Sequence, residues 1–371
     1  MVLLRPTISS GNPSTNGVTP EPICLLCGVL ITAADDESSK DILSRKRKWI
    51  ARWNLKTKQH MLVTSHEIEE ASFADCPRLW SMFCRANRLI RTVIKESDRK
   101  FRLTGINMLS SNHGPYYTPT DPATARIGGL RYAGYDDTQF TQFYAASITR
   151  QPRQYKGSVV GYIVHAHCWA LFGQIEGLKL NKTALAQVVQ TCRKFWHRNE
   201  LWGAYGNLLF SKIGPNEPYF NAEYGCDFFL SPLVVGAVQE AIIRAKEENL
   251  RFASTKAIVP LCRFSGLPLE IAILIAELIC PVQYTPNDVN DMREMLLAFR
   301  WKLPDWFWRK RWSKHLFIEL GVKGGTAPVD WLLWLNLLGL VSDPDWFRYS
   351  GLPNRERVVG IILALENIYV Q

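Results

Sequence analysis

The chain has 371 residues, of which 47% are hydrophobic and 12% aromatic, so it is long enough to bury a sizeable core. A charged fraction of 21% and 13 tryptophans exclude a chain that is disordered throughout. Lysine and arginine outnumber aspartate and glutamate by 44 to 34, and this net charge of +10 permits an acidic partner or nucleic acid without requiring either.

The cellular compartment follows from apolar runs and cysteine usage. No apolar run reaches the roughly 20 residues that span a bilayer, and the longest candidate, residues 267–282, contains Glu270 and Glu277. The first five residues are too short for the apolar region of a signal peptide, and nine cysteines spread thinly over the chain indicate reduced thiols. We therefore expect a cytoplasmic and/or nuclear protein without membrane association, which excludes the secreted, membrane-spanning and collagen-like classes.

The N-terminal half begins with a segment of distinct composition. Residues 1–22 are rich in Pro, Ser, Gly, Asn and Thr, which predicts a disordered lead-in. The basic run at 45–48 resembles a nuclear address or a phosphate contact, but a solvated face is the favoured interpretation. We expect order to begin near Ile23 and predict a mixed α/β domain over 23–230.

Predicted elements follow in order along this domain. Apolar residues spaced three and four apart predict a helix over 76–96. Gly, Pro, Tyr and Thr predict turns with short strands over 104–107 and 110–134. The remaining predicted elements are a strand over 158–164, helices over 168–175 and 182–197, and irregular structure over 202–229.

The C-terminal half, 231–371, shows apolar positions at helical spacing, with Pro and Gly between most stretches. Helices are predicted near 233–249, 268–280, 287–300, 305–319, 328–339 and 354–369. The sequence therefore predicts an α+β fold, with a mixed α/β N-terminal half and a mostly α-helical C-terminal half.

Common enzyme signatures are absent from the sequence. There is no dinucleotide-binding glycine pattern, no phosphate-binding loop and no nucleophile elbow. The stretch that begins at His66 and Glu67 lacks the second histidine of a zinc protease. We therefore expect that the chain is not an enzyme.

Two short motifs carry metal-ligand chemistry. Cys24 and Cys27 form a Cys-x-x-Cys knuckle closed by Gly28, and His165 and Cys168 form a His-x-x-Cys pair far downstream. Together they predict a Cys₃His site for structural zinc, in which His167 is an alternative to His165. The two motifs lie too far apart for their spacing to support a zinc site, so the favoured alternative is two buried structural thiols beside a core histidine. If the four side chains converge on one point in the fold, zinc becomes the better interpretation. Cys76 and Cys84 are interpreted as small core residues.

The segment 266–279 predicts a helix that is apolar on nearly every side. Pro268 suits the first turn, and an apolar stripe follows at three and four spacing, formed by Ile271, Leu274, Ile275 and Leu278. Such a helix is either buried in its own core or half buried and half covered by a partner. Periodicity alone favours an ordinary core helix.

An ordered set of motifs then resembles a known family. Leu-Pro-x-Glu-Ile at 267–271 resembles the opening helix of an F-box. Seven further segments resemble a large group of filamentous-fungal F-box domain-containing proteins. They are the Cys24 knuckle, the turn at 103–106, the segment 165–169, and the blocks 295–304, 307–311, 330–331 and 351–357. The resemblance runs in order from about residue 23 to 369, with an F-box-like segment over 265–312.

This resemblance implies a substrate-recognition adaptor for ubiquitin-dependent degradation. Such a chain binds a Skp-type adaptor, and through it a cullin scaffold of a RING ubiquitin ligase, while the remainder selects an unknown protein substrate. The residues implied at the adaptor interface are Leu267, Pro268, Glu270, Ile271, Ile275 and Leu278. The alternatives are a metal-stabilised protein-interaction module without a ligase role and a basic nucleic-acid-binding protein.

Tryptophans and cations interleave in the segment 300–314. Base stacking between cations is how single-stranded nucleic acid is held, but Trp308 and Trp312 lie four apart on the predicted helix. An aromatic core with a basic outer face is therefore favoured, and nucleic acid is disfavoured as a partner. Arg355 and Arg357 are interpreted as structural residues paired with acids such as Asp330 or Asp345.

Overall fold

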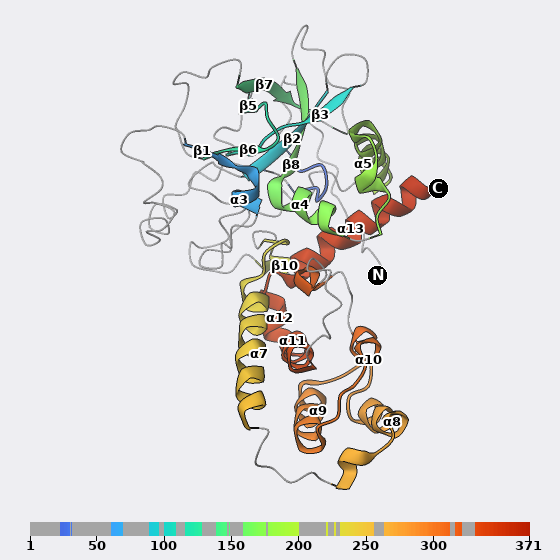
Figure 1. Ribbon diagram of the computed structural model, residues 1–371. Helices are drawn as coiled ribbons and strands as arrows, with labels where there is room; N and C mark the ends of the chain where they lie inside the picture. The colour runs from blue at the N-terminus through green and yellow to red at the C-terminus, as the bar shows by residue number, and fades with distance from the viewer. Residues whose placement is uncertain are drawn as a thin grey trace.

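In the computed structural model, the strands precede residue 228 and most helices follow them, which confirms the predicted α+β class (Figure 1). The structure describes residues 23–29, 31, 61–69, 89–95, 100–108, 116–127, 139–146, 148, 159–175, 177–199, 220–221, 226–227, 231–255, 263–311, 316–320 and 331–371. The predicted lead-in, the basic run at 45–48, Cys76 and Cys84, and most of the segment 202–229 lie outside these residues.

The main sheet has six strands in the order β3-β2-β8-β7-β5, with β4 paired to β2. Its pairs are antiparallel except for the parallel pair of β7 and β8. The strands are β2 (Leu89–Lys95), β3 (Phe101–Leu103), β4 (Asn107–Met108), β5 (Tyr116–Pro119), β7 (Phe140–Ala145) and β8 (Val160–His165). The strand predicted over 158–164 is thus confirmed as β8, and it lies at the centre of the sheet.

Two further antiparallel pairs accompany this sheet. Strands β1 (Met61–Thr64) and β6 (Thr124–Ile127) form one, and β9 (Phe220–Asn221) and β10 (Cys226–Asp227) form the other. The short helix α3 (Ser65–Glu69) follows β1 directly. Turns with short strands were predicted over 104–107 and 110–134, and β5 and β6 confirm the strands of the second range, while β4 begins at the end of the first.

The helix predicted over 76–96 is wrong over Leu89–Lys95, which form β2. This strand is hydrogen-bonded to β3 and β4 along one edge and to β8 along the other. Its consecutive residues Thr92, Val93 and Ile94 are all buried, so both faces of the strand are covered. An unbroken buried run has no alternation to distinguish it from a helix, and the β-branched side chains were the better signal.

Three helices complete the core of the N-terminal half. Helices α4 (Ala166–Gln174) and α5 (Leu185–Asn199) confirm the helices predicted there and pack against β8, β2 and β3. The last helix, α13 (Leu352–Val370), returns from the C-terminal half and packs against α5 and α4 (Figure 1). Val164, Trp196 and Ile362 therefore belong to one hydrophobic core.

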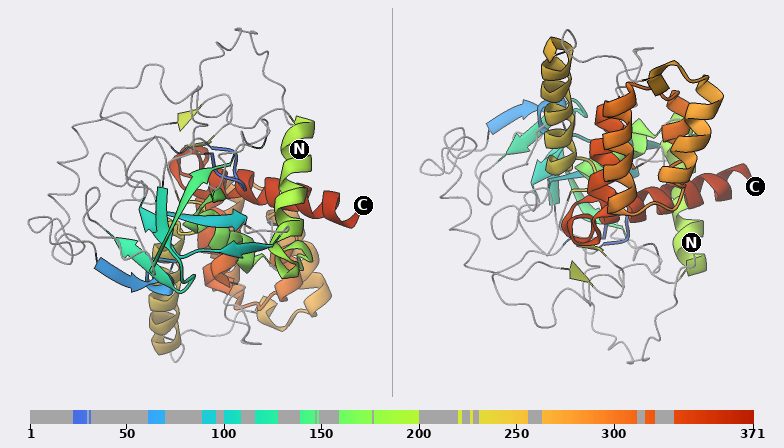
Figure 2. Two further views of the ribbon diagram at one scale, coloured as in Figure 1. Left: turned by 90° about the horizontal axis from the view of Figure 1, so that it is seen from above. Right: turned by 90° about the horizontal axis from the view of Figure 1, so that it is seen from below.

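The C-terminal half is helical, as predicted. Its helices are α7 (Gly236–Thr255), α8 (Leu269–Ile279), α9 (Pro286–Phe299), α10 (Asp305–Arg309), α11 (Trp331–Ser342) and α12 (Pro344–Tyr349), with 3₁₀ turns at Arg263–Gly266 and Ile318–Leu320. One hydrophobic cluster joins α8, α9, α10 and α11, and another joins α7, α11 and α12. Helix α8 lies at the outer edge of this half, on the side opposite α7 (Figure 2). No helix within the described residues has the length and apolar character that a membrane span requires.

The helix predicted over 305–319 is much shorter, because α10 ends at Arg309. The backbone N–H of Arg311 donates to Trp308 O at 2.9 Å, three residues back. Nη1 of Arg311 donates to Phe307 O at 2.7 Å, and this is the carbonyl that would accept from the backbone N–H of Arg311 if the helix continued. Helix α12 was not predicted, although Asp343 caps it and Pro344 opens it, since six residues are too few to show periodicity.

Arg355 is buried and pairs with Glu319 at 2.7 Å, in place of the Asp330 or Asp345 predicted from sequence. Its guanidinium also donates to the carbonyls of Pro232, Leu233 and Leu316. Every arm of the guanidinium is thereby hydrogen-bonded, which joins α13 to the start of the helical half. The prediction of a structural role is confirmed, and only the partner differs.

Candidate functional site

The Cys-x-x-Cys segment forms a tight knuckle that is buried in the N-terminal core. The N–H of Gly28 donates to Cys24 O at 2.9 Å, and the N–H of Cys24 donates to Val29 O at 3.0 Å. Gly28 has a φ of 71°, a conformation that glycine adopts without steric cost. A Cβ at this position would lie 2.5 Å from Cη2 of Trp196, so the turn also needs glycine for space.

The second half of the site lies where β8 ends and α4 begins. His165 is the last residue of the strand, and Cys168 lies in the first turn of the helix. The backbone N–H of His165 points at Cys24 Sγ at 3.4 Å, which supports negative charge on that sulfur. The change from strand to helix thus aims both side chains at the knuckle.

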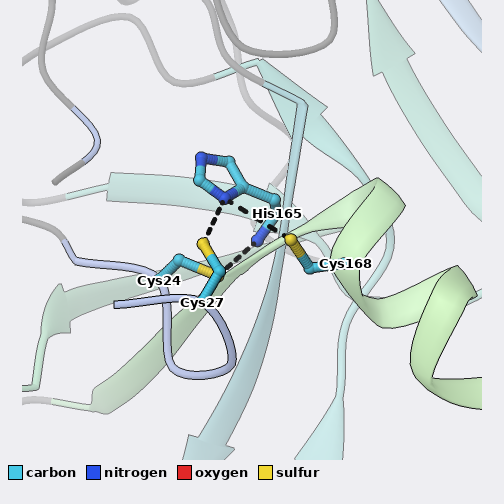
Figure 3. Close-up of side chains that lie close together, drawn as sticks. All are labelled: Cys24, Cys27, His165 and Cys168. Carbon is cyan, nitrogen blue, oxygen red and sulfur yellow. Dashed lines mark hydrogen bonds between the residues drawn. The ribbon is translucent and has the colours of Figure 1, made fainter. Parts of the chain in front are cut away.

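Cys24, Cys27, His165 and Cys168 converge on one point, and all four are fully buried (Figure 3). Their ligand atoms lie within 4.8 Å of one another. His165 Nδ1 is 3.4 Å from Cys27 Sγ and 3.9 Å from Cys168 Sγ. Ligands about 2.3 Å from a tetrahedral ion lie about 3.8 Å apart, so this cluster has the dimensions and the donor set of a four-coordinate metal site.

His167 is not part of the cluster, which removes it as an alternative ligand. It is buried, and its Nδ1 lies 2.9 Å from Ser231 Oγ. Ser231 Oγ in turn accepts from the N–H groups of Leu233 and Val234. Burial lowers the pKa of His167 to about 4, so its imidazole is neutral at physiological pH.

Burial opposes ionisation of all three thiols of the site. It raises the pKa of Cys24 and of Cys168. Burial also opposes ionisation of Cys27, but hydrogen bonds from Cys168 and Cys24 and the attraction of His165 outweigh it and lower its pKa well below the ordinary value. The site therefore accommodates one thiolate readily, and a metal ion that binds all three sulfurs displaces the protons of the other two.

Ile163, Trp196 and Arg357 support the knuckle from outside, and the sequence placed none of them there, since Arg357 was predicted to be a structural partner of acids. Leu25 N–H donates to Ile163 O at 2.7 Å, and Trp196 Nε1 donates to Leu25 O at 2.8 Å. Arg357 Nη1 donates to Cys27 O at 2.9 Å. Trp196 and Arg357 are 171 and 330 residues from their partners, so no local pattern could have pointed to them.

Three of the four stripe residues of α8 that periodicity assigned to a core are exposed. Ile271, Leu274 and Leu278 are 42%, 57% and 84% exposed, whereas Ile275 packs against the cluster of α8 to α11. The fully buried residues of α8 are the small Ala272 and Ala276. The core-helix interpretation is therefore wrong for these three residues, since the alanines let the helix pack closely with the three side chains turned outward.

The other residues implied at the adaptor interface divide between the two faces of this helix. Pro268 and Glu270 are exposed, whereas Leu267 and Ile275 are half-buried and pack against the cluster of α8 to α11. Arg311 anchors the end of the helix, because its Nε and Nη2 donate to Cys280 O at 2.9 and 2.6 Å. The exposed face is thus presented on a fixed helix.

Two of the tryptophans in the segment 300–314, Trp301 and Trp308, are buried, which confirms the predicted aromatic core for them, whereas Trp306 is 45% exposed and Trp312 lies outside the described residues. Arg311 was predicted on a basic outer face, but it is buried, with its guanidinium 3.5 Å from the ring centroid of Phe307. Lys310 is exposed and lies over Trp306, 3.9 Å from Glu277 of α8.

Comparison with protein-family models, with curated proteins and with solved structures finds no match for this chain. The fold and the site therefore define the class on their own. The chain is an α+β protein with a buried cluster of three cysteines and one histidine that can hold a metal ion.

Proposed function

We propose that this chain is a substrate-recognition adaptor of the F-box type, which binds a Skp-type adaptor through α8 and so joins a cullin-RING ubiquitin ligase. The observation that carries the proposal is the exposed apolar face of α8, the first helix of the F-box-like segment 265–312. Ile271, Leu274 and Leu278 share that face.

This face has the composition of a helix-in-groove contact. Aliphatic anchors at i, i+3 and i+7 fit an apolar groove, while charged groups belong at its rim. Glu270 and the pair of Glu277 with Lys310 provide such a rim. Full burial of one leucine contributes roughly 1.5–3 kcal/mol, so covering the 57% of Leu274 and the 84% of Leu278 that are still exposed contributes roughly 2–4 kcal/mol.

The buried tryptophans favour this proposal over nucleic-acid binding. A base stacks on an aromatic face that solvent can reach, whereas Trp301 and Trp308 face the protein core. Arg311 uses its guanidinium for backbone carbonyls of its own chain. In the proposed function the ligase partners carry out the chemistry, and this chain acts in the cytoplasm or nucleus by binding.

We propose in addition that the metal at the Cys₃His cluster is structural zinc. Three sulfurs and one nitrogen close a tetrahedral site without an open position, as structural zinc prefers. Full burial of all four residues leaves no approach for a substrate. The metal would hold the knuckle against β8 and α4 and give the chain no reactivity of its own.

Co-purification with a fungal Skp-type adaptor tests the function. The wild type is compared with a Leu274→Asp, Leu278→Asp double variant and with Ile243→Asp as a matched control. Ile243 is 56% exposed and lies on α7, so the control replaces an exposed apolar side chain elsewhere with one of the two carboxylates that the double variant adds. Half-buried Leu267 is avoided because its loss would disturb the core.

We expect capture of the adaptor by the wild type and by Ile243→Asp, and at least about 100-fold weaker binding by the double variant. All three proteins should have the same circular dichroism and melting temperature. Folded wild type that fails to bind the adaptor would refute the proposal. If such protein still contains one zinc per chain, the function reduces to that of a metal-stabilised interaction module without a ligase role.

A further inference from the structure

Arg357 connects the C-terminal helix to the cysteine knuckle. It lies on α13, is 9% exposed, and donates from Nη1 to Cys27 O at 2.9 Å. Cys27 is a member of the four-residue cluster, so this bond fixes the backbone of a metal-ligand residue. The two residues are 330 positions apart, and the contact therefore spans nearly the whole chain.

Asn354 orients the guanidinium of Arg357. Its side-chain oxygen accepts from Arg357 Nε at 3.2 Å and from Nη2 at 3.0 Å. Asn354 is fully buried one turn earlier on the same helix. With these two bonds made within α13, Nη1 is directed at the knuckle, and the arrangement is set by the helix itself.

The position of Arg357 also suits the charge of a loaded site. Three thiolates and a neutral histidine around a divalent ion carry a formal charge of −1, and this charge lies in a fully buried region. Burying an uncompensated charge is costly, and a guanidinium bonded to the backbone of a ligand residue offsets it. Groups that surround the ligands in this way orient them and raise metal affinity.

We infer that Arg357 is a positioning residue of the metal centre, and that metal binding and the docking of α13 on the N-terminal half stabilise each other. The inference rests on the proposed occupancy of the cluster by zinc. It is independent of the adaptor contact, which involves α8. Because such a coupling is reciprocal, loss of the metal loosens α13 by as much as loss of the α13 contact weakens the metal.

Zinc transfer to a chromophoric chelator tests the first part. The zinc-loaded full chain is compared as wild type, Arg357→Gln and Arg357→Lys. Gln removes the positive charge, whereas Lys keeps the charge but loses the planar fork that bonds Asn354 and Cys27 together. Controls are Leu296→Val and Leu296→Ala, because Leu296 is fully buried but lies on α9 in a different hydrophobic cluster, so its loss lowers stability without touching the contact of α13 with the N-terminal half.

We expect Arg357→Gln to bind zinc about 10–100-fold more weakly than the wild type and Arg357→Lys to lie between them. The Leu296 variants should lower the melting temperature without a comparable loss of zinc affinity. If an Arg357 variant and a Leu296 variant with equal melting temperatures lose zinc alike, Arg357 acts only through stability and the inference is overturned. The milder Lys variant preserves this comparison if Arg357→Gln fails to fold.

Hydrogen exchange of the wild type, with and without chelator, tests the reciprocal part. Removal of zinc should lower the protection of α13 amides more than that of α9 amides, since α9 lies in a different hydrophobic cluster. Equal loss in both helices would contradict the coupling. Wild type without stoichiometric zinc would overturn the inference together with the proposed metal, while adaptor capture would still decide the ligase function separately.

Discussion

The knuckle glycine offers the sharpest test of the site, because two separate costs meet at Gly28. Its φ of 71° disfavours any residue with a Cβ by roughly 1–2 kcal/mol. An added Cβ would also lie 2.5 Å from Cη2 and 3.0 Å from Cζ3 of Trp196. The indole is rigid, fully enclosed and fixed by its bond to Leu25 O, so it has no room to move aside.

Gly28→Ala should therefore combine the backbone cost with an overpacking cost of roughly 1–3 kcal/mol, about 2–5 kcal/mol in all. Gly177→Ala is the matched control. Gly177 has a φ of 82°, but a Cβ there would meet nothing within 4 Å, so only the backbone cost applies. The difference between the two variants isolates the contact with Trp196.

Chemical unfolding of both variants in zinc-containing buffer, followed by circular dichroism, measures this difference. We expect Gly28→Ala to unfold at lower denaturant than Gly177→Ala, and a Gly28→Ala, Trp196→Phe double variant to cost less than the sum of its single changes. Equal destabilisation by Gly28→Ala and Gly177→Ala would show that the knuckle does not press against Trp196. The account of why glycine closes this turn would then be wrong.

Two further predictions concern the metal and the buried ion pair. Cys168→Ser should lose stoichiometric zinc and melt at a lower temperature, because a serine hydroxyl does not replace a thiolate. Cys192→Ser changes a buried cysteine outside the cluster and should keep its zinc. Elemental analysis of the folded proteins measures the zinc content of both, and zinc retained by Cys168→Ser would contradict the ligand assignment. Arg355→Met should lower the free energy of unfolding by about 3–5 kcal/mol, because it leaves Glu319 and three backbone carbonyls without their partner. Denaturant unfolding measures this change, and a decrease below about 1 kcal/mol would mean that the pair contributes little to stability.

Local sequence signals predicted the fold where one signal dominated. The helices of the C-terminal half follow from apolar periodicity, and the structure adds a capping box of Thr285 and Asp288 at the start of α9. The signal failed at β2, where a strand buried on both faces has no alternation. It also failed at α10, because Arg311 donates to Cys280 O at the end of α8, 31 residues away, and helical propensity does not contain such a tertiary contact.

The candidate site was predicted in its residue types and not in its supports. Thiols and an imidazole at knuckle spacing identify the ligands, whereas their convergence depends on how β8 passes the knuckle. For α8 the reverse holds: the apolar stripe was evident, but which side faces outward depends on Ala272 and Ala276 fitting against α9 and its neighbours. Periodicity shows which residues share one face of a helix, but only packing against the rest of the chain decides which face is buried.

The length of chain between the two half-sites explains why a metal suits this position. Cys24 and His165 are 141 residues apart. Closing a flexible loop of that length costs on the order of 4 kcal/mol, because the entropy grows only with the logarithm of length. Structural zinc binding supplies roughly 10–16 kcal/mol at neutral pH, which exceeds that cost several-fold. Zinc would therefore fix the N-terminal knuckle to the centre of the sheet, where Trp196 and Arg357 can then reach it from segments still further along the chain.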